Sequence, residues 1–236
     1  HYWKIWIIKK VGENMDNEYP NVTFENRMRK IENDIKQLGD LAIKSNEEVI
    51  SLINAPDETL YEAIAKRSGE IDLKAVNLER DCITFMATEK PVAHDLIFVE
   101  SSIRIISHIK RIGRLLMKIS QSLKNIQDIE IPEKTKTDLD SIAKYVKGML
   151  EKSIEAFLNE DIQKARELTI DDDEVDDLYD SILEQSMIMI ENSKSVPKFM
   201  DLIMIARNFE RIADKTVNIG SRIVFMQTLK RPDIEQ

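Results

Sequence analysis

The sequence is poor in the residues that make turns and cross-links. It has six glycines, six prolines and one cysteine, Cys82, among 236 residues, whereas glycine and proline together make up about 12% of an average protein. Aromatic residues account for only 6%. This composition argues against a β-sandwich, barrel or propeller. A single cysteine excludes an internal disulfide framework and a cysteine-based zinc site.

Basic charge and long apolar runs are lacking as well. The chain carries 34 lysines and arginines against 43 aspartates and glutamates, a net charge of −9. An acidic chain is a poor match for nucleic acid, which binds basic surfaces. No apolar run approaches the ~20 residues that span a bilayer. The short apolar stretch at residues 2–8 lacks the cleavage site of a signal peptide, and we assign residues 1–22 to an N-terminal extension of unknown role.

The rest of the chain reads as one helix after another. Proline and capping residues such as aspartate and asparagine punctuate long segments in which apolar residues recur with helical spacing. Six helices are predicted, at residues 24–54, 57–88, 91–127, 134–158, 160–193 and 197–228. Long helices joined by short loops form antiparallel bundles.

The two halves of the chain share one pattern. Apolar residues repeat at intervals of three and four from Leu202 to Met226, and the same seam lies 100 residues earlier, where Arg111 aligns with Arg211. The preceding helices align with a shift of 104, which places Asp72 on the position of Asp176. We therefore predict an all-α fold of two tandem three-helix bundles, with domains at residues 23–130 and 131–230.

Carboxylates gather in the second half. Glu210 and Asp214 lie four residues apart, hence on one face of the last helix. The helix before it carries Asp172, Asp176 and Asp180 with the same spacing. If these helices are antiparallel neighbours, the two stripes face each other and can bind a divalent metal through oxygen ligands. The alternative is a solvated acidic face without metal.

The first half reverses the charge of this face. Lys110 and Arg114 stand in the places of Glu210 and Asp214, and Lys118 follows one turn later. A second carboxylate site is therefore not expected. The basic face either pairs with acidic residues of the neighbouring helix or contacts an anion or an acidic partner.

The segment from Phe209 to Ile219 resembles the signature of the PhoU family of phosphate-uptake regulators, Glu-Arg-Ile-(Gly/Ala)-Asp followed by Asn-Ile. The run from Asp172 to Asp180 is similar to the family's other acidic motif, and the two-fold helical repeat also agrees. The resemblance implies a cytoplasmic adaptor, which we expect to be peripheral to the membrane and to form a homodimer through apolar helix faces. It would restrain a Pst-type phosphate transporter through its ATPase subunit and relay phosphate status to a sensor histidine kinase.

The resemblance also implies a cofactor, because some members bind multinuclear iron or zinc clusters through pairs of carboxylates. In this chain those ligands would be Asp172, Asp176, Asp180, Glu210 and Asp214; another divalent metal remains an alternative. Since the first copy of the signature lacks both acids, at most one such site is expected. Because the first copy departs from the signature in this way, the alternative is that the chain is a paralogue that serves another transporter, such as a sodium–phosphate symporter.

Two other classes of protein are alternatives to a regulator. A two-metal oxidase in a helical bundle needs Glu-x-x-His pairs, and no histidine of the sequence has a glutamate three residues before it. Cys82 falls at a core position of its helix and is expected to be a buried apolar residue rather than a nucleophile. We therefore expect that the protein is not an enzyme. A metal-free helical scaffold is the other alternative.

Overall fold

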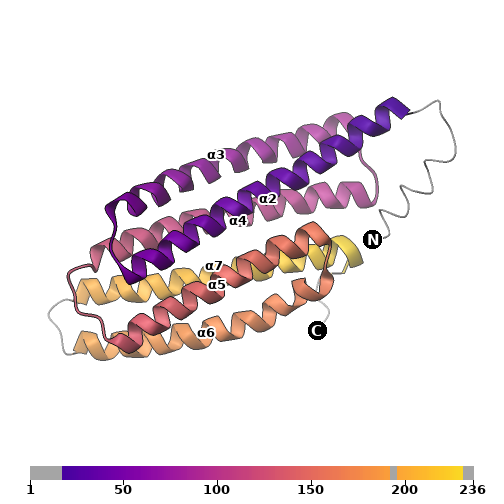
Figure 1. Ribbon diagram of the computed structural model, residues 1–236. Coiled ribbons are helices and arrows are strands. Elements are labelled where there is room, and N and C mark those ends of the chain that lie inside the picture. Colours follow the sequence, from indigo (N-terminus) through magenta and orange to yellow (C-terminus); the bar gives the residue numbers. More distant parts are fainter. Residues whose placement is uncertain (1–17, 192–195, 231–236) are drawn as a thin grey trace.

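The computed structural model describes residues 18–191 and 196–230 of the chain and shows only helices there (Figure 1). The helices are α2 (Glu18–Asn54), α3 (Glu58–Glu89), α4 (His94–Asn125), α5 (Glu133–Asn159), α6 (Ile162–Glu191) and α7 (Val196–Thr228). The all-α prediction is confirmed. Residues 18–22 of the expected N-terminal extension belong to α2, and residues 1–17 lie outside the described part. No helix in the described ranges is long and apolar enough to cross a membrane.

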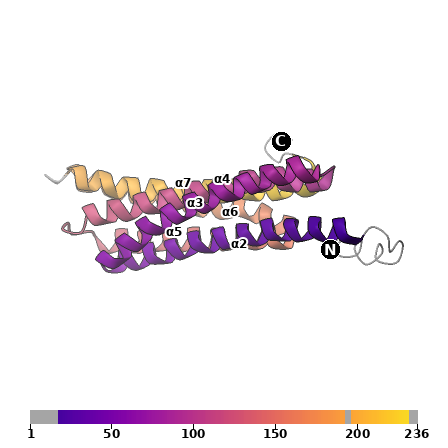
Figure 2. The same cartoon turned by 90° about the horizontal axis from the view of Figure 1, so that it is seen from above.

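The helices form two three-helix bundles lying side by side (Figure 1). The first contains α2, α3 and α4, and the second contains α5, α6 and α7. Helix α4 packs along α7, and α2 packs along α5, so the two bundles share one continuous apolar core. Figure 2 shows α4 and α7 next to each other along one edge of the molecule.

The pattern of buried residues repeats between the two bundles, with the shifts of 104 and 100 residues found in the sequence. In α3 the buried residues include Tyr61, Ile64, Ile71, Leu78 and Cys82, and in α6 the residues 104 positions later, Ala165, Leu168, Val175, Ile182 and Ser186, are buried too. Between α4 and α7 the shift is 100, as in Ile105 and Ile205. Helices at equivalent positions therefore turn equivalent faces to the core.

Cys82 is fully buried, as expected. Burial, and then the negative charge of nearby acidic side chains such as Asp81, raises the pKa of its thiol to about 12. Because the thiolate is the reactive form, this cysteine is chemically inert at neutral pH.

The junction between α3 and α4 differs from the expected one. Helix α4 begins at His94 rather than at residue 91, because Lys90 and Ala93 both adopt a positive φ of 49° and interrupt the helical path. The proline at position 91 contributes, since the residue before a proline is kept out of the right-handed helical region. His94 is exposed at this turn.

Helices α4 and α7 run antiparallel. Ser122 donates a hydrogen bond from its Oγ to Oδ1 of Asp201 at 2.8 Å near one end. Arg222 and Glu100 form an ion pair of 3.6 Å near the other. In this alignment Arg111 lies opposite Arg211, so equivalent residues of the two repeats meet at the middle of the molecule.

Candidate functional site

Helices α6 and α7 approach closely enough to bring the two acidic stripes together. Gly220 of α7 makes one of these close approaches possible. A Cβ atom there would lie 2.5 Å from the backbone oxygen of Ala165 and 3.0 Å from Cδ1 of Leu168. The absence of a side chain therefore lets the backbones meet. The carboxylates of both helices then lie beside the same interface.

The carboxylates act on one another electrostatically. Burial raises the pKa of Asp172 to about 6, with further contributions from Asp176, Asp214 and Glu210. Burial also raises the pKa of Asp176, followed by the charges of Asp214, Asp173 and Asp180 among others. The pKa of Glu210 is raised by burial and then by Asp214 and Asp176. Asp172, Asp176, Glu210 and Asp214 therefore repel one another, and Asp180 joins them through Asp176. We call these five residues, which are the predicted ligands, the acidic cluster.

The acidic cluster is partly accessible. Asp172, Glu210 and Asp214 are half-buried, whereas Asp176 and Asp180 are exposed. The donor atoms are carboxylate oxygens from two facing helices, which suits a hard or borderline metal ion. Across the described residues, however, no three acidic, histidine or cysteine side chains converge as a cage for a metal ion. Binding would require some of the exposed carboxylates to change rotamer.

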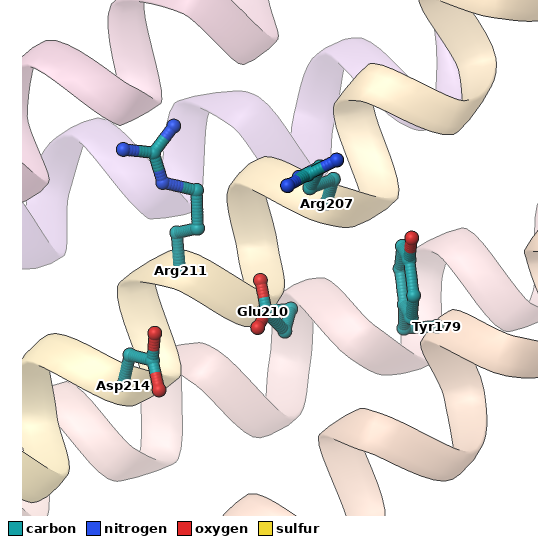
Figure 3. Close-up of a pocket in the computed structure, with 5 residues that line it drawn as sticks. All are labelled: Tyr179, Arg207, Glu210, Arg211 and Asp214. Atoms are coloured by element: carbon teal, nitrogen blue, oxygen red, sulfur yellow. The ribbon is translucent and has the colours of Figure 1, made fainter.

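A shallow, open depression of about 540 Å³ lies beside these carboxylates. It is lined by Tyr179, Arg207, Glu210, Arg211 and Asp214 (Figure 3). Figure 3 shows Glu210 and Asp214 on successive turns of α7 with the ring of Tyr179 on α6, while the side chain of Arg211 extends away from Asp214. The charges of Arg207 and Arg211 oppose the rise in the pKa of Glu210.

Sequence reasoning missed two residues of this depression. These are Tyr179, which lies within the acidic run of α6, and Arg207, which lies one turn before Glu210 on α7. Spacing was the available signal, because Arg207 precedes Glu210 by three residues and Tyr179 follows Asp176 by three. Asn218, one turn after Asp214 on α7, donates from Nδ2 to the backbone oxygen of Asp214 at 2.6 Å.

The first bundle neutralises the equivalent face with its own side chains. Arg114 donates from Nε to both carboxylate oxygens of Asp72, at 2.9 and 3.0 Å. Lys110 forms an ion pair of 2.8 Å with Glu79. Since Asp72 and Arg114 correspond to Asp176 and Asp214, an attractive pair in one repeat occupies the place of a repulsive pair in the other. Lys118 is exposed on α4.

Removing one charge from the acidic cluster is expected to stabilise the metal-free protein near neutral pH. The pKa of Asp172 lies above its ordinary 3.8 in the folded chain, at about 6. The folded state therefore holds more protons between these values, and stability falls as pH rises through them. Asp172→Asn should raise Tm by about 2–4 °C at neutral pH, roughly 1 kcal/mol after allowing for solvent screening.

The test is thermal unfolding in the presence of a chelator across the acidic and neutral range. The gain should vanish below the ordinary carboxylate pKa, because Asp172 is then protonated in both states. Glu62→Gln, an equal charge change at an exposed position of α3, is the matched control. A gain for Asp172→Asn that is the same at every pH, or that Glu62→Gln reproduces, contradicts the repulsion.

Known proteins resemble the chain along most of its length. The family model of the PhoU domain matches twice, at residues 35–123 and 139–223. A relative from Methanothermobacter thermautotrophicus, named phosphate-specific transport system accessory protein PhoU homolog 1, is 38% identical over 219 residues, covering 92% of this chain and all of the relative. The PhoU accessory protein of Escherichia coli is 25% identical over 211 residues, covering 89% and 87%.

Solved structures share the fold. PhoU from Pseudomonas aeruginosa matches with a TM-score of 0.83 at 19% identity, covering 88% of this chain and 100% of the other. The PhoU regulatory protein from Streptococcus pneumoniae matches with a TM-score of 0.82 at 22% identity, covering 88% and 98%. The two matches of the family model start 104 residues apart and end 100 apart, the same two shifts that relate the helices of the two bundles.

Proposed function

Because the chain belongs to the PhoU family, we propose that it is a non-enzymatic regulator of phosphate uptake. It restrains a phosphate transporter, in the first instance the ATPase subunit of a Pst-type system, and relays phosphate status to a sensor histidine kinase. The names of its relatives, which are accessory proteins of phosphate-specific transport systems, support this assignment. The alternative partner within the same function is a sodium–phosphate symporter.

Cellular location and oligomeric state follow from the same function. The protein works in the cytoplasm, at the membrane surface, as a homodimer. Exposed apolar side chains on one face of α3, Leu73, Val76 and Ile83, support self-association, because their spacing of three and seven residues places them on one stripe of the helix.

The observation that carries the mechanism is the acidic cluster. Five carboxylates on two helices repel one another, and two of them lie within the family signature on α7. Asp172, Asp176, Asp180, Glu210 and Asp214 would hold iron, zinc or another divalent metal, and the bound ion would supply the positive charge that offsets this repulsion. With the repulsion offset, α6 and α7 are held together as a rigid surface on which a partner docks.

The test is a pull-down of tagged protein from solubilised membranes of cells grown with ample or scarce phosphate. The wild type should recover a phosphate-transporter subunit in amounts that change with phosphate supply, and the same preparation should contain metal. The double variant Glu210→Gln with Asp214→Asn should lose most of the metal, about tenfold or more, and should recover less transporter.

The matched control is Glu62→Gln with Glu70→Gln, which removes two exposed carboxylates from α3 and should change neither readout. Recovery of no transporter or kinase under either condition contradicts the regulatory function. Unchanged partner recovery by Glu210→Gln with Asp214→Asn contradicts the role of the acidic cluster and favours a metal-free scaffold.

A further inference from the structure

A second charged site lies on the α4–α7 pair. Arg104, His108 and Arg111 follow one another on α4 at intervals of four and three residues, so they share one helical face. Lys215 and Arg222 stand two turns apart on α7, and the ion pair between Arg222 and Glu100 shows that this part of α7 faces the same part of α4. We call these five residues the basic seam.

His108 is the centre of the basic seam. Its Nδ1 atom is buried and has no hydrogen-bond partner among the described residues. Burial lowers the pKa of the imidazole to about 4, and the positive charges of Lys215, Arg111, Arg222 and Arg104 lower it further. The ring is therefore neutral at physiological pH and is surrounded by cations from both helices.

Glu100 and Asp214 form ion pairs with residues of the basic seam. Glu100 contacts both Arg104 and Arg222, and the nearest carboxylate oxygen to the ammonium of Lys215 in an ion pair belongs to Asp214, at 3.9 Å. The side chains of Lys215 and Arg222 are only 19% and 16% exposed. Lys215 and Arg222 therefore lie in a partly desolvated place, where like charges repel more strongly than in water, whereas Arg104 and Arg111 are exposed.

The fold itself does not require these charges. Four of the five equivalent positions in the other repeat, across the centre of the same helix pair, carry uncharged residues: Met204 for Arg104, Asn208 for His108, Leu115 for Lys215 and Ser122 for Arg222. The fifth keeps its charge, because Arg211 corresponds to Arg111. Asn208 and Leu115 are buried there. Since the same packing works at one end with Arg211 alone, the other three charges of the basic seam need another explanation.

We propose that the basic seam binds a phosphate group between α4 and α7. Guanidinium and ammonium groups offer several N–H donors to the oxygens of an oxyanion, and such charge-assisted hydrogen bonds are the strong ones. His108 can add a further donor from its ring. The phosphate group is that of free inorganic phosphate or of a phospholipid headgroup, which have the same chemistry at the point of contact.

The site adjoins the acidic cluster through the ion pair between Lys215 and Asp214, but it uses none of the five carboxylates to bind the phosphate group and needs no metal. In choosing phosphate over another oxyanion, the inference rests on the proposed function. Bound phosphate would offset the repulsion among the cations, and the pKa of His108 would rise. Occupancy would also draw α4 and α7 together at the interface between the two bundles, which links phosphate binding to their packing.

The test is direct binding of inorganic phosphate to the purified full chain, measured by calorimetry, with sulfate as the competing oxyanion. A second arm measures co-sedimentation with vesicles of phosphatidylglycerol or of phosphatidylcholine at physiological ionic strength. Lys215→Gln and Arg222→Gln should each weaken binding about tenfold, the effect of one charge-assisted contact. Lys44→Gln and Lys66→Gln, at exposed positions of α2 and α3, are the matched controls and should bind normally.

A second readout does not depend on the variants. The ring signals of His108 in an NMR titration should report a higher pKa in the presence of phosphate, because the added negative charge favours the protonated ring. Binding of inorganic phosphate with this shift assigns free phosphate. Binding to phosphatidylglycerol vesicles alone, with loss in Lys215→Gln, assigns a headgroup.

Three results overturn the inference: no binding in either arm, equal losses in the control variants, or an unchanged pKa of His108 on binding. These measurements use the isolated protein, whereas the pull-down tests the regulatory role in cells. A seam that fails to bind phosphate while transporter recovery still follows phosphate supply defeats the inference alone. Binding without any recovered transporter or kinase defeats the proposed function alone.

Discussion

Replacing Gly220 with alanine is expected to lower the free energy of unfolding by about 2–3 kcal/mol, because the added Cβ overpacks an interface that has no slack. The atom it meets at 2.5 Å is the backbone oxygen of Ala165, which cannot turn aside as a side chain can. Tm should fall by roughly 5–10 °C for a chain of this size. The expected response is a separation of α6 from α7, which would also weaken the acidic cluster.

Gly148 provides the matched control for this prediction. It lies inside α5, and a Cβ atom there would have no neighbour within 4 Å. Gly148→Ala should raise stability by about 0.5–1 kcal/mol, because glycine is the poorer helix former. Thermal and denaturant unfolding of both variants measures the difference. If Gly220→Ala is as stable as the wild type, α6 and α7 do not pack as closely as described.

The second large effect is expected from reversing the charges of the first bundle. Lys110→Glu with Arg114→Asp breaks two ion pairs, one of them between largely buried side chains, and leaves Asp72 and Glu79 beside new negative charges. We expect a loss of about 2–4 kcal/mol in metal-free protein, with most of it arising at the less exposed Lys110–Glu79 pair.

The same variant should respond to metal, because it recreates in the first repeat the two acids of the family signature. Its Tm should rise more on addition of a divalent metal than that of the wild type, since a ligand that binds only the folded state stabilises it. Lys44→Glu with Lys66→Asp makes the same change in net charge at exposed positions and should lose less than about 1 kcal/mol. Equal losses in the two double variants would show that net charge, rather than the ion pairs, matters.

Much of the fold could be predicted because long amphipathic helices leave a regular signal. The seam predicted from Leu202 to Met226 is buried throughout the core of α7, and the shifts of 100 and 104 reappear in the burial pattern. The start of α4 could not be predicted, because Lys90 and Ala93 carry no sequence mark of a positive φ, for which glycine is the usual residue.

The candidate site was predictable on each helix but not across helices. Spacing of four placed Asp172 with Asp176 and Glu210 with Asp214, and the electrostatic coupling of these residues in the structure agrees with the expected facing stripes. The basic seam was missed. Its residues lie on α4 and α7, and only the antiparallel alignment of these helices places Lys215 near His108. The sequence pattern of either helix alone does not predict how α4 and α7 align with each other.

The side-chain amide of Asn46 on α2 helps the two similar halves of the chain to avoid mispairing during folding. Asn46 is fully buried and donates from Nδ2 to the backbone oxygen of Ala143 on α5 at 2.9 Å. Its counterpart in the other repeat is Leu150, which is apolar. If α2 slid by one turn along α5, or entered the place of α5, the amide would be buried without this bond, at a cost of about 1–3 kcal/mol. The hydrogen bond of Asn46 therefore favours the native register and pairing of α2 with α5. A core of leucine and isoleucine alone would not distinguish them in this way.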